Sequence, residues 1–164
     1  MSNVDWELTW ITVQAVSAVV ATVVVIATAL YAGRQLRETA RSRYAQVLDK
    51  IHDILSAPAV EAARLAVSQL PDNFDVDSLT EQQKASIELV SRSFDRAGFY
   101  LWCKLIPAEY VLPEYPGAVW HWRKLKRYVE SQRETQRYEA RRFFEYMAKE
   151  TEKFRKKHGL PSPV

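Results

Sequence analysis

The stretch that decides the fold is ITVQAVSAVVATVVVIATALYA, residues 11–32, which contains no charged side chain and is apolar on every side of a helix. At about 1.5 Å per residue, a helix of this length spans roughly 30 Å, the thickness of a bilayer's hydrocarbon core. Trp6 and Trp10 precede the stretch and Tyr31 lies at its end, where aromatic side chains anchor a span at the membrane interface. We therefore predict a transmembrane helix over residues 11–32.

Two other interpretations of residues 11–32 fit less well. A signal peptide carries positive charge before its apolar core, whereas the preceding residues include Asp5 and Glu7 and no Lys or Arg. A core helix of a soluble protein needs enough apolar surface around it to enclose every side, and the rest of the chain offers too little.

The charges that flank the span predict its orientation. No basic residue precedes residue 33, whereas Arg34, Arg37, Arg41 and Arg43 follow closely. Positive charge accumulates on the cytosolic side of single-span proteins. Residues 1–10 are therefore expected outside the membrane and the C-terminal body in the cytosol.

Small side chains recur along one face of the predicted span, at helical spacing. Such a stripe lets two helices approach closely, and we expect the span to form a homo-oligomer through it. The stripe consists of Ala15, Ala18, Thr22, Ala29 and Gly33.

Three polar side chains within the span allow a second interpretation, in which they line a narrow pore between copies: Gln14, Thr22 and Thr28. The alternative is that the threonine hydroxyls donate to carbonyls of their own helix, in which case they require no partner.

The chain after the span reads as further helix. No proline occurs before Pro58, so the spanning helix is expected to continue over residues 33–56. The apolar positions of this extension either pack on their own domain, which we favour, or pair with a second copy; they are Leu36, Ala40, Tyr44, Val47, Ile51 and Ile54. Residues 57–158 then form a helical domain, and residues 159–164 a flexible tail.

Several signals place helices within residues 57–158. Pro58 starts a short helix and Pro71 ends it, while Thr80 and Gln83 form a capping box that starts another. The expected buried positions of these two helices are Val60, Ala63, Val67 and Leu70, then Ile87, Val90, Phe94, Ala97 and Leu101. From residue 118 to 158 there is no Gly or Pro, which predicts one long helix with Val119, Trp122, Leu125, Val129, Phe143, Tyr146 and Met147 on its apolar faces.

Charge divides this domain into two sections. Residues 57–117 hold 5 basic and 9 acidic side chains, whereas residues 118–158 hold 13 basic and 6 acidic ones. The basic section interleaves its cations with aromatic residues, a composition typical of nucleic-acid surfaces. These aromatic residues are Trp120, Trp122, Tyr128, Tyr138, Phe143 and Phe144.

A continuous helix would place Arg133, Arg137 and Arg141 at successive four-residue steps, with Arg142 beside them, as a site for a nucleotide or oligonucleotide. The alternative is a solvated face with ion pairs, because Lys126 and Glu130, Arg141 and Glu145, Glu145 and Lys149, and Glu152 and Lys156 are also four residues apart. The run from Lys153 to Lys157 is in addition suited to anionic lipid.

Composition argues against catalysis. The chain has no Gly-rich phosphate loop, no nucleophile elbow and no metal-spaced histidines, so we expect neither an enzyme nor a bound cofactor or metal. The single cysteine, Cys103, excludes an intrachain disulfide, and we expect it to fill a gap in the core.

Three further features carry a family resemblance: RQLRET at residues 34–39 after a Trp-flanked span, FDRAG at residues 94–98, and a helix beginning with WHWR at residues 120–123. With them the chain resembles, over roughly residues 8–147, the bacterial family called domain of unknown function 4760. The resemblance implies a small all-α protein anchored in the inner membrane of a bacterium, with no assigned chemistry and no site residues to transfer.

The sequence thus supports two hypotheses. In the first, a non-enzymatic single-span protein self-associates through its span and binds a protein partner with its cytosolic helices. In the second, the chain is a pore-forming effector of an anti-phage system, gated by a nucleotide or oligonucleotide at the basic residues.

Overall fold

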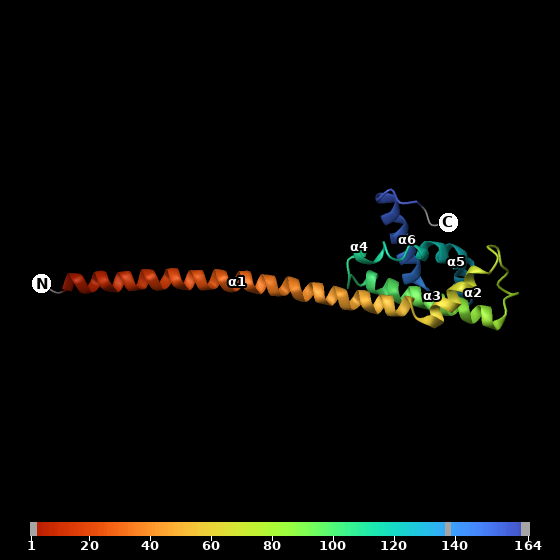
Figure 1. Ribbon diagram of the computed structural model, residues 1–164, viewed down its shortest axis with the longest axis horizontal. Coiled ribbons are helices and arrows are strands. Elements are labelled where there is room, and N and C mark those ends of the chain that lie inside the picture. Colours follow the sequence, from red (N-terminus) through yellow and green to blue (C-terminus); the bar gives the residue numbers. More distant parts are fainter. Residues whose placement is uncertain (1–2, 137–138, 162–164) are drawn as a thin grey trace. The chain divides into compact units, whose positions relative to one another are not determined.

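The computed structural model describes residues 3–136 and 139–161, and every regular element among them is an α-helix. Figure 1 shows the element order, which is α1 (Asn3–Leu55), α2 (Pro58–Ser68), α3 (Glu81–Trp102), α4 (Ala108–Val111), α5 (Gly117–Gln136) and α6 (Arg142–Lys157). The chain divides into two compact units, Met1–Arg43 and Tyr44–Val164. The all-α prediction is confirmed for the described residues.

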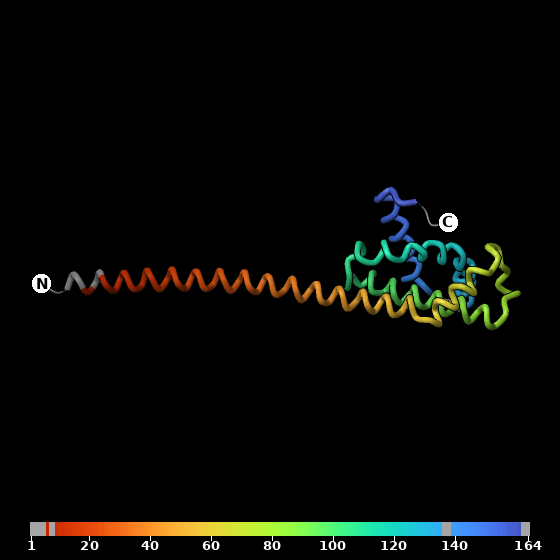
Figure 2. The backbone as a smooth tube through the Cα atoms, in the orientation of Figure 1, coloured from red at the N-terminus to blue at the C-terminus, as the bar shows by residue number. Residues whose placement is uncertain are grey.

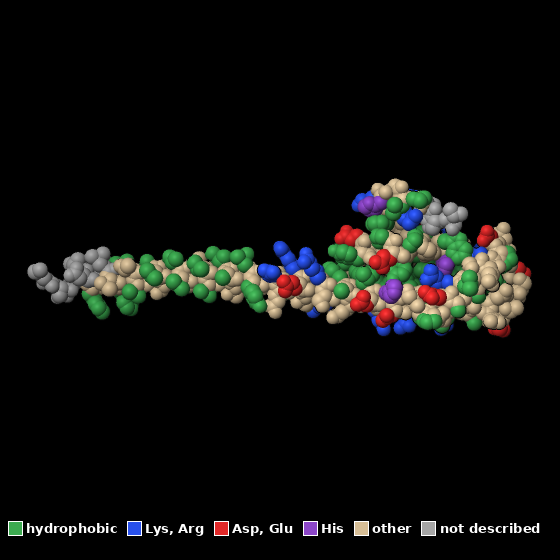
Figure 3. All heavy atoms as spheres, in the orientation of Figure 1, with side chains coloured by type: hydrophobic (Ala, Val, Ile, Leu, Met, Phe, Trp, Pro, Cys, Tyr) green, Lys and Arg blue, Asp and Glu red, His purple; other side chains and the backbone are tan. Residues whose placement is uncertain are grey.

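Helix α1 is uninterrupted from Asn3 to Leu55, which confirms the predicted continuation beyond residue 33. Its part from Thr9 onward is long and apolar enough to cross a membrane, with a mean hydropathy of 2.3 in its most apolar window. None of that window is buried within the protein. Figure 3 shows hydrophobic side chains along this part of α1, followed by a group of basic ones.

The second unit is built around α3. The capping box forms as predicted, because Gln83 N–H donates to Thr80 Oγ1 at 3.2 Å while Gln83 Oε1 accepts from Thr80 N–H at 2.9 Å. Helices α2, α5 and α6 all contact α3, and Figure 2 traces the path of the chain through them. The core positions predicted for residues 58–101 are all buried, as are Val119, Trp122, Leu125 and Val129 of α5.

The end of α1 belongs to this second unit. Ile51 and Leu55 are completely buried in its core, and Tyr44, Val47 and Ile54 pack against it. From residue 44 onward, the apolar positions of α1 therefore pack on their own domain, as predicted.

The prediction of a single long helix over residues 118–158 is wrong. Helix α5 ends at Gln136 and α6 begins at Arg142, and Arg141 has a left-handed backbone with φ of 59°. The new start of α6 changes which side chains face the core, so that Phe144 is buried whereas Phe143 and Tyr146 are only partly so. Met147 is buried as predicted.

Candidate functional site

Helices α3 and α6 share the most extensive contact between two helices of the described residues, and the FDRAG residues of α3 lie in it. Phe94 stacks on Phe144 with ring centroids 5.0 Å apart. A Cβ atom on Gly98 would lie 2.1 Å from the Phe143 carbonyl oxygen, so only glycine fits there. The Asp95 carboxylate accepts from the N–H groups of Phe143 and Phe144 at 3.0 and 3.1 Å, which caps α6 from another helix.

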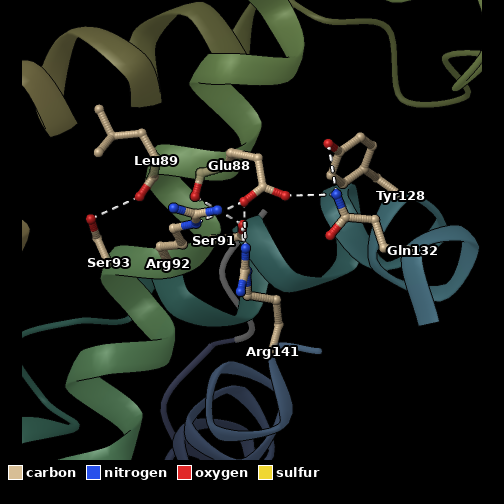
Figure 4. A network of polar contacts seen from close by, with 8 residues as sticks. All are labelled: Glu88, Leu89, Ser91, Arg92, Ser93, Tyr128, Gln132 and Arg141. Atoms are coloured by element: carbon tan, nitrogen blue, oxygen red, sulfur yellow. Dashed lines mark hydrogen bonds and ion pairs between the residues drawn. The ribbon is translucent and has the colours of Figure 1, made fainter. Parts of the chain in front are cut away.

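A polar network beside this crossing holds the connection between α5 and α6 (Figure 4). The Arg141 guanidinium donates to Glu88 Oε2, and its Nε donates to Ser91 Oγ at 3.1 Å. Glu88 Oε1 accepts from Gln132 Nε2 at 2.6 Å, which ties α5 to the same carboxylate. Burial alone raises the pKa of Glu88, but the hydrogen bond from Gln132 and the charge of Arg141 outweigh it and hold that pKa below its ordinary value. We call Glu88, Ser91, Gln132 and Arg141 the clasp.

Arg133 of α5 also binds the connection between α5 and α6. Its Nε donates to the Ala140 carbonyl at 2.8 Å, and its guanidinium donates to Glu145 Oε2 at 2.9 Å. The other oxygen of Glu145 accepts from Lys149 at 2.7 Å. Burial raises the pKa of Glu145, but the bonds from Lys149 and Arg133 lower it below its ordinary value overall.

The four arginines proposed as an anion site are therefore not on one helical stripe. Arg133 lies on α5, Arg141 in the turn that precedes α6, and Arg142 at the start of α6, while Arg137 lies outside the described residues. Arg133 and Arg141 bind carboxylates of their own domain. Arg142 stands 3.7 Å from Glu139 and over the Phe143 ring, with 4.6 Å to its centroid.

The prediction that aromatic side chains lie on the surface of the basic section is also wrong for most of them. Trp122, Tyr128 and Phe144 are buried, and Trp120 and Phe143 are partly buried. Tyr138 lies outside the described residues. Of the predicted ion pairs, Lys126 with Glu130, Glu145 with Lys149 and Glu152 with Lys156 form, whereas Arg141 bonds to Glu88 instead of Glu145.

Exposed aromatic residues occur instead where α3 meets α6. Trp102 lies with its ring centroid 5.1 Å from that of Tyr146, and Phe99 lies 5.2 Å from Phe143. Trp102 also lies 6.1 Å from Phe143, so the four rings form one continuous group, which we call the aromatic edge. Trp102 is 54% exposed and Phe99 is 44% exposed. Phe99 and Trp102 are not among the site residues predicted from the sequence, although both stand outside the apolar stripe predicted for this helix.

A hollow of about 290 Å³ adjoins the aromatic edge. Trp102 and Tyr146 form its apolar wall, and its polar lining consists of Arg133, Glu139, Arg142, Glu145 and Lys149. Two of the four predicted arginines, Arg133 and Arg142, thus line one hollow, whereas Arg141 and Arg142 line another beside Asp95.

His121 and Cys103 are two further side chains with reactive groups, and neither belongs to the clasp or lines either hollow. His121 is 6% exposed, lies edge-on to Phe94, and forms no hydrogen bond through either ring nitrogen within the described part of the chain. Burial, reinforced by the charges of Arg64 and Lys124, lowers its pKa to about 3. Cys103 is exposed at the end of α3, so the expectation that it fills a core gap is wrong.

In the membrane-apolar part of α1, the predicted residues remain on the surface. Ala15, Ala18, Thr22 and Ala29 are exposed, and Gly33 has open space around it. Thr22 and Thr28 donate to the carbonyls of Ala18 and Val24, each at 2.8 Å, which is the in-helix alternative to a pore-lining role. Gln14 is exposed.

No group of three or more potential metal-ligating side chains occurs among residues 3–136 and 139–161. No protein family model, curated protein or solved structure matches this chain. The family resemblance therefore stays a prediction.

Proposed function

We propose that this chain is a non-enzymatic, single-span membrane protein that self-associates through α1 and binds a protein partner with the helices that follow residue 43. The observation that carries the proposal is that every residue from 11 to 32 is exposed, although the stretch is apolar. Val19, Val25 and Leu30 are each more than three-fifths exposed, at 64%, 66% and 71%. At about 25 cal/mol per Å², such a surface is strongly unfavourable in water, and a bilayer covers it.

The charges after the span support a cytosolic location for the second unit. Arg34, Arg37, Arg41 and Arg43 lie within about three helical turns of the span's end, and no basic side chain precedes it in this sequence. A green fluorescent protein fused to the C-terminus is expected to fluoresce, because that fluorophore matures in the cytosol. A dark but expressed and inserted fusion would reverse the proposed orientation.

Self-association is supported by the small side chains on one face of α1. Without a hydrophobic driving force in lipid, helices associate by close packing, which small residues allow. The hydroxyls of Thr22 and Thr28 already have acceptors within the helix. This favours a packed helix interface over a polar channel.

The test is the oligomer mass in detergent, measured by sedimentation. Ala18→Leu with Thr22→Leu places bulk on the small face and is expected to shift the oligomer toward monomer. Val20→Leu with Val24→Leu enlarges the opposite face of the same helix and serves as the matched control. An unchanged mass for both variants would refute this interface.

The structure does not favour the ligand-gated effector as a second function. That hypothesis relied on a single arginine stripe, whereas Arg133 lies on α5 and Arg141 lies in the turn before α6, where each binds a carboxylate of its own domain.

A further inference from the structure

The aromatic edge is an apolar surface without a covering element among the described residues. Phe99 and Trp102 keep about half of their surface exposed although both stand on a long, well-packed helix. Contiguous exposed apolar patches in folded domains mark interaction sites, and Trp, Tyr and Phe contribute most of the binding free energy at such sites.

The rings of the aromatic edge are held in place before any partner arrives. Gly98 allows α6 to approach α3 closely, and Asp95 fixes the first turn of α6, one residue of which is Phe143. The edge-to-face contacts then link Trp102 to Tyr146 and Phe99 to Phe143. A rigid surface loses little conformational entropy on binding, which favours affinity.

The charges around the aromatic edge are mostly positive. Arg142 and Lys149 line the adjoining hollow with side chains 57% and 62% exposed. Arg96 lies one helical turn before Phe99, and Lys104 follows Trp102 by two residues; both are exposed, and neither forms an ion pair within the described residues. Arg96 and Lys104 therefore offer N–H donors to a binding partner, and Arg142, whose pair with Glu139 is long and exposed, offers further ones, whereas Lys149 binds Glu145 at 2.7 Å.

The carboxylates of the same region already have partners. Asp95 accepts from two backbone N–H groups, and Glu145 binds both Arg133 and Lys149. Glu139 stands near Arg142 at 3.7 Å, a long and exposed ion pair of small energy. The region therefore complements negative charge, and a second copy's identical cationic surface would be repelled from it.

From this combination we propose that the aromatic edge is a docking surface for an acidic segment of a cytosolic protein. Apolar side chains of the segment cover Trp102 and Phe99, and its carboxylates bind Arg142 and Arg96. The inference rests on the proposed function, because it locates the partner-binding surface of the second unit and requires that unit to lie in the cytosol.

The experiment is a selection from a random peptide library displayed on phage, against the full chain in lipid nanodiscs. The matched selection uses the Phe99→Ala, Trp102→Ala double variant, whose folding is checked by its circular dichroism melt. Peptides recovered on the unmodified chain but not on the variant are expected to be rich in Asp and Glu and to contain apolar anchors. Their affinity, measured by fluorescence anisotropy, is expected to fall about tenfold or more with Trp102→Ala.

Charge reversal distinguishes docking of an acidic segment from nonspecific binding to the apolar surface. Arg142→Glu with Arg96→Glu is expected to weaken the selected peptides about tenfold and to reduce the salt dependence of their binding. Leu65→Ala removes another exposed apolar side chain, 63% exposed on α2, and is the control expected to change nothing.

Several outcomes would overturn the inference. These are recovery of peptides without acidic enrichment, equal recovery on the double variant, no recovery at all, or binding of phosphatidylglycerol vesicles or ATP at the same residues instead of peptide. The C-terminal green fluorescent protein fusion shows whether the second unit lies in the cytosol, and the oligomer mass of the same preparation tests self-association. A fluorescent fusion and a normal mass with failed selection reject only the docking surface.

Discussion

Two long stretches of this chain lack proline, and only one of them forms a single uninterrupted helix. Residues 3–55 include Gly33 and yet form one uninterrupted helix, whereas residues 118–157 contain neither Gly nor Pro and are divided between α5 and α6. The difference lies in what surrounds each stretch. The described side chains of residues 11–32 are all exposed and the helix there keeps its own backbone hydrogen bonds, while α3 offers the second stretch a cap from Asp95, the Glu88 carboxylate and a packing surface. Helix breakers are thus not required where tertiary contacts compensate the broken turn.

Gly98→Val gives the largest expected effect and breaks the contact that makes the second stretch different. Its Cβ would overlap the Phe143 carbonyl, so α6 must move away from α3, and we expect a loss of about 3 kcal/mol or more in unfolding free energy. Urea unfolding of the full chain in detergent, followed by the circular dichroism signal, measures it. Gly117→Ala is the control, since nothing lies within 4 Å of its Cβ, and a similar loss there would contradict the explanation.

Acid should destabilise the second unit and leave the apolar part of α1 helical. The pKa of His121 is about 3 in the folded state and about 6.5 in the unfolded chain, so below pH 6.5 the unfolded state binds more protons. The contribution of His121 to stability is therefore expected to fall as pH decreases from 6.5 toward 3, by at most about 1.4 kcal/mol per pH unit for this one group.

His121→Leu tests this pH dependence, because it removes the titrating group while keeping an apolar side chain beside Phe94. Its unfolding free energy should depend less on pH between 6.5 and 4.5 than that of the unmodified chain. His158→Gln, which changes an exposed histidine, is the control. An unaltered slope in His121→Leu would show that other groups cause the acid sensitivity.

Glu88→Gln tests whether the clasp stabilises the connection that divides α5 from α6. It removes the charge that Arg141 binds, and we expect a loss of about 1–3 kcal/mol because the Arg141 side chain is only 11% exposed. Hydrogen exchange read by mass spectrometry should increase in α6 but not in residues 11–32. Arg92→Gln removes the exposed partner of the same carboxylate and should cost less than about 1 kcal/mol. Equal effects of both variants would argue against a special role for Arg141.

The smallest effects are expected in the span. Thr28→Val removes a hydroxyl whose acceptor is the Val24 carbonyl of its own helix, so oligomer mass and insertion should not change. For the same reason, liposomes that carry the full chain should retain a trapped dye, with or without added nucleotides. Dye release that Thr28→Val abolishes would restore the pore hypothesis.

Local patterns predicted much of this fold correctly. The capping box of Thr80 and Gln83, Pro58 at the first turn of α2 and the apolar spacing from Ile87 to Leu101 all depend on interactions within about four residues. The candidate site could not be predicted in this way. Arg141 bonds to Glu88, more than fifty residues earlier, and Asp95 caps a helix that starts beyond residue 140.

What the sequence by itself determined is the presence of helices α1, α2 and α3 and the apolar surface of residues 11–32, because all of these follow from local composition and period. What only the tertiary structure decided is the break at Arg141, the burial of Trp122, Tyr128 and Phe144, and the exposure of Phe99 and Trp102. A regular helix leaves every side chain on some face, and which face is covered depends on the helices that pack against it.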